Sequence, residues 1–285
     1  MALGAGVGAA VGSPKSTEVS AARQLARIMT ATRASGTARF TFSEVGTSTN
    51  ASLRSSEKGL GVVDFATDSL RVSQRDRNTE FTGTSTTAQR AVTEDTSISN
   101  IWIGRTDYLE FHLAGALPRP VWIKQATWPR SSFGPLGPLG QIGPLGELTL
   151  DLSVPGLRLQ DQGATVVRGI PATAYLVVVP TCARRPAGIA STSSSPLEVW
   201  VDGRDRMVQA RVTTRVDFTE AMLRADHLNG PLAGAGETET GRATDVSTIE
   251  LADFGAPADI AAPPVPNRIG AGSSSSIEMK LKGCT

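Results

Sequence analysis

The chain has 285 residues, of which 40% are hydrophobic, and its 28 basic and 27 acidic residues leave a net charge of +1. This length suits one large β domain or two small ones, and we expect a single domain. No stretch approaches the roughly 18 consecutive apolar residues of a membrane span, and the charges are scattered singly, so neither a membrane helix nor a nucleic-acid partner is predicted.

Residues 1–16 have the small, apolar character of the end of a signal peptide, although they lack its basic start. We interpret them as a truncated or disordered signal and expect an exported protein of the cell envelope or the extracellular space. No cysteine follows this stretch, so these residues show no lipobox through which a lipid could anchor the chain.

Residues 17–35 form the clearest predicted helix, with Thr17 as a candidate N-cap and Gly36 beyond the end. After this helix the hydrophobic period changes from 3.6 to 2, which is typical of half-buried strands. About nine or ten strands in a meander are predicted. The alternating stretches are 38–45, 60–65, 69–75, 86–95, 99–111, 165–179, 196–218 and 244–254.

A tight hairpin is predicted within 196–218, because residues 202–204 form an Asp-Gly-Arg turn between two alternating runs. The second run predicts one apolar face, which carries Val208, Ala210, Val212 and Val216.

The segment 133–148 contains three Pro-Leu-Gly units, which exclude a regular helix or a central strand. Its apolar side chains need another apolar partner. The segment either caps the core permanently or forms a mobile lid over a cavity, and the sequence leaves both open. The side chains of this cover are Phe133, Leu136, Leu139, Ile142 and Leu145.

The chain has two cysteines, Cys182 and Cys284, and no C-x-x-C pair. In an exported protein we expect them to form a disulfide that fastens the C-terminal tail, whereas in a reducing compartment both would be free thiols. Such a bond would close a loop of about 100 residues, worth roughly 4 to 5 kcal/mol in the chain-entropy model.

Residues with catalytic or metal-binding potential are few. The only histidines, His112 and His227, have no second ligand at metal-binding spacing, so no metal and no cofactor are predicted. No G-x-S-x-G nucleophile elbow occurs, and the paired acids fall in predicted turns, where they bond the backbone. We therefore predict a protein that is not an enzyme; a hydrolase or transferase would need a polar pocket that the sequence does not reveal.

Several local signatures follow one another between about residues 18 and 265. They are ARFTFSE after the opening helix; GLGVVDF with Gly59, Gly61 and Asp64; Trp122 in PVWIK; Gly169, Thr173 and Tyr175 in RGIPATAY; Val199, Trp200 and Asp202 in VWVDGRDRMV; and Asp253, Phe254 and Gly255 in STIELADFGAPADIAAPP. In this order they resemble the LppX and LprG family of mycobacterial lipoproteins, which is related to the periplasmic carrier LolA.

The resemblance implies an α+β fold of mainly antiparallel strands, in which a strongly curved open sheet, or half-barrel, is covered by a few helices and loops. From the length and the composition of the chain we expect one domain over residues 17–265 and an extended tail over 266–285. The resemblance also implies a monomeric, non-catalytic carrier of lipid acyl chains or a lipidated molecule that meets membrane surfaces transiently. The expected cavity lining is Phe40, Phe42, Val63, Phe65, Leu70, Val72, Ile101, Ile103, Tyr175, Val177, Val208 and Val212.

A second interpretation uses the same fold differently. An envelope module that senses or scaffolds a protein partner would fill the cavity with its own side chains and bind no lipid. An empty apolar cavity of several hundred Å³ would favour the carrier.

Overall fold

The structure is a computed structural model. It describes residues 18–48, 53–82, 90–104, 106–113, 121–126, 135–142, 145, 157–178, 192–194, 197–218, 241–263 and 267–268. The predicted division into three segments stays a prediction, since residues 1–17 and 269–285 lie outside this range. No helix among the described residues is both long enough and apolar enough to cross a membrane.

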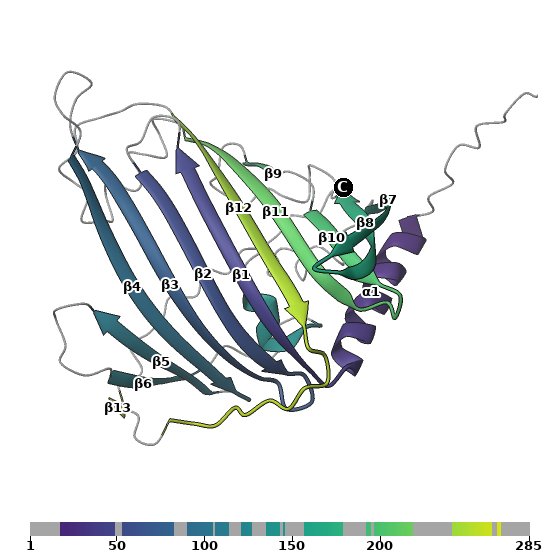
Figure 1. Ribbon diagram of the computed structural model, residues 1–285, viewed down its shortest axis with the longest axis horizontal. Helices are drawn as coiled ribbons and strands as arrows, with labels where there is room; N and C mark the ends of the chain where they lie inside the picture. The colour runs from purple at the N-terminus through teal and green to yellow at the C-terminus, as the bar shows by residue number, and fades with distance from the viewer. Residues whose placement is uncertain are drawn as a thin grey trace, which may run out of the picture.

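The described strands form one 13-stranded sheet, in the order β13-β6-β5-β4-β3-β2-β1-β12-β11-β10-β8-β7, with β9 paired to β11 (Figure 1). The short β13 is parallel to β6, and every other pair is antiparallel. The strands are β1 (Thr37–Ser48), β2 (Leu53–Asp64), β3 (Ser69–Thr82), β4 (Arg90–Ile103), β5 (Thr106–Leu113), β6 (Val121–Ala126), β7 (Arg158–Val167), β8 (Ile170–Val178), β9 (Thr192–Ser194), β10 (Leu197–Asp202), β11 (Met207–Phe218), β12 (Gly241–Ala252) and β13 (Asn267–Arg268).

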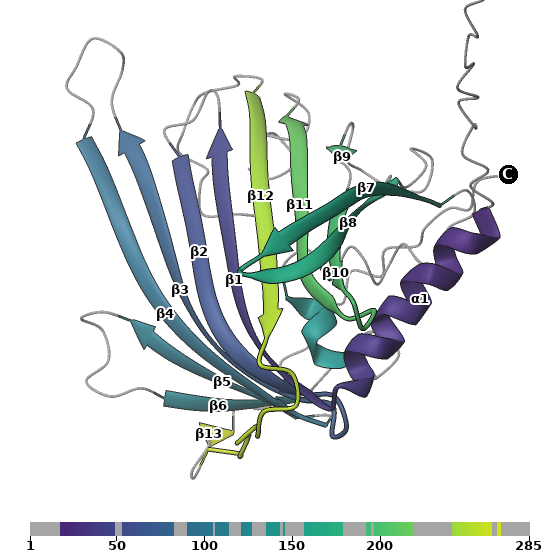
Figure 2. The same cartoon turned by 45° about the vertical axis from the view of Figure 1, so that its right-hand side comes forward.

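The sheet is strongly curved, and its two ends do not pair, so it is an open half-barrel (Figure 2). The helix α1 (Glu18–Ala34) and the short 3-10 helix η2 (Gly137–Gln141) lie on its inner side. The predicted fold class is confirmed.

Helix α1 packs on the sheet through one apolar face, two ion pairs join it to turns of the sheet, and one buried hydroxyl group bonds it to β11. Leu25, Ile28 and Met29 are buried in the core. Buried Thr32 donates from Oγ1 to the carbonyl of Ile28 at 2.8 Å and accepts the backbone N–H of Met207 at 2.9 Å. The side chain of Thr32 thus joins the last turns of the helix to the start of β11.

Two predicted strand boundaries were wrong. The stretch 165–179 is not one strand but the β7–β8 hairpin, because Arg168 and Gly169 both adopt positive φ, 48° and 82°, and reverse the chain. The stretches 86–95 and 99–111 are also divided differently. Strand β4 runs unbroken to Ile103, and the chain turns at Gly104, where φ is 58°.

The predicted hairpin at 202–204 is present between β10 and β11, and Asp202 organises its turn. The Asp202 carboxylate accepts hydrogen bonds from the backbone N–H groups of Arg204 and Arg206 and from the guanidinium of Arg206. Burial raises the pKa of Asp202, but these bonds outweigh it and leave the pKa below its usual value.

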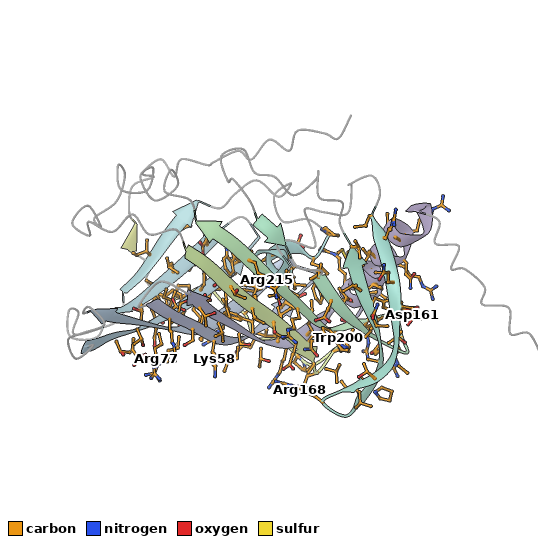
Figure 3. The ribbon with its side chains drawn as sticks, turned by 90° about the horizontal axis from the view of Figure 1, so that it is seen from above. Lys58, Arg77, Asp161, Arg168, Trp200 and Arg215 are labelled. Carbon is orange, nitrogen blue, oxygen red and sulfur yellow. The ribbon has the colours of Figure 1, made fainter. Side chains whose placement is uncertain are left out.

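Side chains of the central strands alternate between the inner and the outer face of the half-barrel. Even-numbered residues of β1 and β3 and odd-numbered residues of β2 point inward, where Phe40, Val63 and Leu70 join the core that α1 also enters. Outward-pointing side chains include Lys58 and Arg77, which Figure 3 shows on the side of the sheet away from α1.

Candidate functional site on the inner face

The centre of the inner face is an apolar floor built around two phenylalanines and two glycines. Phe42 is the register partner of Gly59, and Phe40 of Gly61. A Cβ atom on Gly59 would lie 2.1 Å from a ring carbon of Phe42, and one on Gly61 would lie 2.4 Å from the ring of Phe40. The glycines of β2 therefore leave the space in which the two rings lie flat across the sheet.

Most of the predicted lining residues come together in this floor. They share one buried cluster with the apolar face of α1, and Tyr175 packs against the cluster while only partly buried. The members of the cluster that the sequence predicted are Phe40, Phe42, Val63, Phe65, Leu70, Val72, Val177 and Val212.

Three predicted lining residues lie elsewhere. On β4, Trp102 is the register partner of the core residue Leu70, so Ile101 and Ile103 alternate to the outer face. Val208 packs in a second cluster with Val167 and Ala172, because a β-bulge shifts the register between β10 and β11.

The cover lies on the apolar floor. Leu136, Leu139 and Leu145 are completely buried and Ile142 nearly so, all within the same cluster as Phe40. Phe133 lies outside the described residues. The described part of the cover occupies the place in which the sequence predicts an apolar ligand.

Few polar contacts hold this cover in place. Within it, the backbone N–H of Ile142 donates to the carbonyl of Leu139, and that of Leu145 to Ile142. Arg33 of α1 donates to Asp68 Oδ1 at 2.7 Å and more weakly to the carbonyl of Pro135 at 3.4 Å. The described cover is held to the sheet mainly by apolar packing and not by a hydrogen-bond ladder.

The apolar surface continues beyond the buried cluster onto the arm formed by β4, β5 and β6. By register, Ile98 and Trp102 of β4, Leu109 of β5 and Ile123 of β6 point to the inner face. Each of these side chains is only half-buried. The floor thus extends sideways as a strip of partly exposed apolar side chains.

A transverse row of acids lies next to the floor, and we call Glu44, Glu57 and Asp76 the acid row. Glu44 is the register partner of Glu57, and Glu57 of Asp76. Burial, with added repulsion from Asp76 and Glu44, raises the pKa of Glu57 to about 7, and burial also raises the pKa of Asp76. The acid row is therefore a set of carboxyl groups with reduced access to water.

Other polar groups on the inner face are also shielded from water. Burial raises the pKa of Asp107 on β5 to about 6 and also raises that of Asp245 on β12. Among the described residues, four buried side-chain oxygens have no hydrogen-bond partner, and all four belong to inward-pointing positions. They are Asp76 Oδ1, Asn100 Oδ1, Asp107 Oδ1 and Ser247 Oγ.

The outer face is different in charge and shape. Its central strands carry basic side chains, among them Lys58, Arg71 and Arg75, and Leu60 is 65% exposed between them. A shallow hollow of about 600 Å³ lies here, and its lining includes Lys58, Leu60, Arg75 and several serine and threonine residues.

No described group of three His, Cys, Asp or Glu residues is placed to hold a metal ion. The side chain of His112, and the residues His227, Cys182 and Cys284, lie outside what the structure describes. The predicted disulfide is therefore still a prediction.

The acid row was not predicted from the sequence. Its three residues come from three strands and meet only in register, whereas the paired acids noted in the sequence are neighbours along the chain. A signal was present, because Glu44 follows Phe40 and Phe42 at the same two-residue spacing and so continues the inner face.

No family model and no curated protein matches the chain. Among solved structures, LppX of Mycobacterium tuberculosis is similar at 12% identity, with a TM-score of 0.42, over 86% of this chain and 100% of that one. LprF of Mycobacterium bovis is similar at 12% identity, with a TM-score of 0.39, over 87% and 99%. A LolA superfamily protein of Nitrosomonas europaea is similar at 10% identity, with a TM-score of 0.25, over 82% and 91%. The resemblance predicted from the sequence is confirmed for the fold.

Proposed function

We propose that the protein is a non-catalytic carrier that holds the acyl chains of a lipid or lipidated molecule on its inner face, for transfer or presentation in the cell envelope. The observation that carries this proposal is the apolar strip of Ile98, Trp102, Leu109 and Ile123. These side chains continue the buried floor but are themselves only half-buried. Contiguous apolar surface that is partly open to solvent is typical of binding sites.

The cover supports the same function. Its buried leucines already make apolar contacts of the kind that acyl chains would make with Phe40 and Phe42. Each buried methylene contributes about 0.8 kcal/mol, so a 16-carbon chain gains roughly 12 kcal/mol on full burial. The described part of the cover has no ladder bonds and can move at little cost in hydrogen bonding, so an acyl chain of this length can take its place on the floor.

Two leucines on opposite faces of the sheet test the proposal. Leu109 lies in the inner apolar strip, whereas Leu60 is exposed on the outer face. We expect Leu109→Glu to weaken the binding of a fluorescent fatty acid at least about tenfold, because an acyl chain would then lie against a charge. The matched variant Leu60→Glu should bind like the original protein. Circular dichroism and thermal unfolding check that both variants fold, and equal binding by both would contradict the proposal.

One observation favours a second function. The described floor beneath the cover is packed by the chain's own leucines, which is what an envelope module without a lipid cargo requires. Such a module would bind a protein partner and no fatty acid. It would be supported if the original protein and both leucine variants all failed to bind the fluorescent fatty acid.

The remaining features of the proposal concern the setting of the protein. We propose that it is exported, acts as a monomer and meets membranes transiently while it exchanges cargo. Under oxidising conditions Cys182 and Cys284 would pair, and free-thiol labelling of the denatured protein before and after reduction tests this.

A further inference from the structure

We propose that the acid row of the inner face receives the ammonium group of an amphiphilic ligand, so that the cargo carries a primary amine in its head group. This inference rests on the proposed function, since the apolar floor must hold the chain of the same ligand. Three independent features of the inner face support it: the surroundings of the carboxyl groups, the unpartnered oxygens beside them, and their position relative to the floor.

The first feature is the separation of charge between the two faces. Among the described side chains of β1, β2, β3, β11 and β12, every lysine and arginine points outward. Glu57 faces Glu44 from β1 and Asp76 from β3, and Asp245 of β12 lies on the same inner face. These strands therefore supply no cation to Glu57, and a ligand with a positive charge would remove the repulsion within the row. The outward bases of the five strands are Arg39, Arg54, Lys58, Arg71, Arg75, Arg77, Arg211 and Arg215.

The second feature is the presence of unpartnered oxygens at the row. Ser247 of β12 is the register partner of Glu44, its side chain is only 5% exposed, and its Oγ has no hydrogen-bond partner. Asp76 Oδ1, at the other end of the row, is also buried without a partner. Buried polar atoms of this kind are rare, because an unmade hydrogen bond costs about 1–3 kcal/mol. A primary ammonium group has three N–H donors for such acceptors.

The type of cation follows from the spacing of the acids. Cross-strand partners on one face have Cβ atoms about 4.5–5.5 Å apart, so the three carboxyl groups are spread over two strand spacings. No described group of acids is close enough to hold a metal ion. An ammonium group, which forms longer bonds to separate acceptors, suits this spacing better than a small divalent ion.

The third feature is the position of the row along the strands. Glu44 is two residues beyond Phe42, Glu57 is two residues from Gly59, and Asp76 is four residues from Val72. One two-residue step along a strand is about 6.8 Å. The row therefore borders the apolar floor directly, so an amine at the row would have its chain on the floor and on the adjoining strip at Ile98.

The test compares three probes that share a 12-carbon chain and differ in the head group: dodecylamine, dodecanol and dodecanoate. The two charged probes are used below their critical micelle concentrations, and dodecanol below its solubility limit. Calorimetry at pH 6.5 with the full chain should show dodecylamine binding at least about tenfold more tightly than dodecanol. Amine binding should also release protons, because an ammonium group favours ionised Glu57. In the double variant Glu57→Gln/Asp76→Asn the preference for the amine should disappear, while dodecanol binds as before. Glu198→Gln, at an outward position of β10, is the matched control and should keep the preference.

The outcomes separate this inference from the proposed function. If dodecanol and dodecanoate bind as well as the amine, or if the double variant retains the preference, the carrier stands and the amine site is wrong. If none of the three probes binds to folded protein, both are wrong. Unfolding curves of the variants show whether a loss of binding reflects a loss of fold.

Discussion

Single residues of the inner face show how closely the floor is fitted. Gly59 and Gly61 are needed because the rings of Phe42 and Phe40 occupy the space of their side chains. Glu57, one two-residue step away, lies among groups that make its charge unfavourable. The side chains of the floor are stabilised by the exclusion of water, whereas the carboxylates of the acid row are destabilised by it, although both sets occupy the same strands.

The fit at Gly59 predicts a clear effect of a single methyl group. In Gly59→Ala the new Cβ atom would overlap the Phe42 ring and lie 2.9 Å from the carbonyl oxygen of Ser73. We expect a loss of about 1–3 kcal/mol in the free energy of unfolding, typical of overpacking. Urea unfolding measures it, with Gly203→Ala, whose Cβ would have no atom within 4 Å, as the control. Equal stability of the two variants would show that the ring does not lie there.

The raised pKa of Glu57 predicts a pH-dependent stability. Because its pKa is about 7 in the folded protein, against 4.5 for an ordinary glutamate side chain, the folded state binds this proton more tightly than the unfolded state. The resulting stabilisation is complete below about pH 4.5 and is lost as the pH rises through 7. Glu57→Gln should therefore be more stable than the original protein at pH 8 by about 1–2 kcal/mol, which allows for solvent screening. No difference at pH 8 would contradict the buried carboxyl group.

At the scale of elements, the periodicity of the sequence was enough to predict α1, most strands and the sheet class. The periodicity did not predict which side chains point inward where apolar and polar residues do not alternate. On β4 near its turn, Ile101 is buried on the outer face beside its register partner Tyr108, while Trp102 packs on the core. Both faces of this stretch are apolar, so no polar side marks which face is the inner one. At Val208 a bulge inserted a residue, which alternation cannot reveal.

At the junction between α1 and the sheet, the buried hydroxyl group of Thr32 accepts a hydrogen bond from β11, which predicts a selective loss of stability when this hydroxyl is removed. In Thr32→Val the shape of the buried side chain is kept, but the N–H of Met207 loses its acceptor. The expected cost is about 1–3 kcal/mol. Thr30→Val on the same helix removes an exposed hydroxyl that bonds only to Ala26 and should cost less than about 0.5 kcal/mol. Chemical denaturation compares the two, and equal losses would contradict the role of Thr32.

At the scale of the whole molecule, a net charge of +1 conceals two faces of opposite character. Charged residues that stand singly in the sequence are sorted by sign between the two faces of β2 and β3. Strand alternation and register place Lys58, Arg71, Arg75 and Arg77 on the outer face and Glu57 and Asp76 on the inner face. Composition alone could not predict this, since it depends on which residue of each strand meets the core. The curved sheet thus has a basic outer face and an inner face that is apolar at its floor and acidic beside it.

Native mass spectrometry of the freshly purified full chain shows whether the inner face holds acyl chains. We expect a folded monomer with a lipid bound in stoichiometric amount, which organic extraction releases. The bound lipid should be reduced in Leu109→Glu but retained in Leu60→Glu. Well-folded protein that emerges empty, and that takes up neither a fatty acid nor a phospholipid when these are added, would contradict the carrier function.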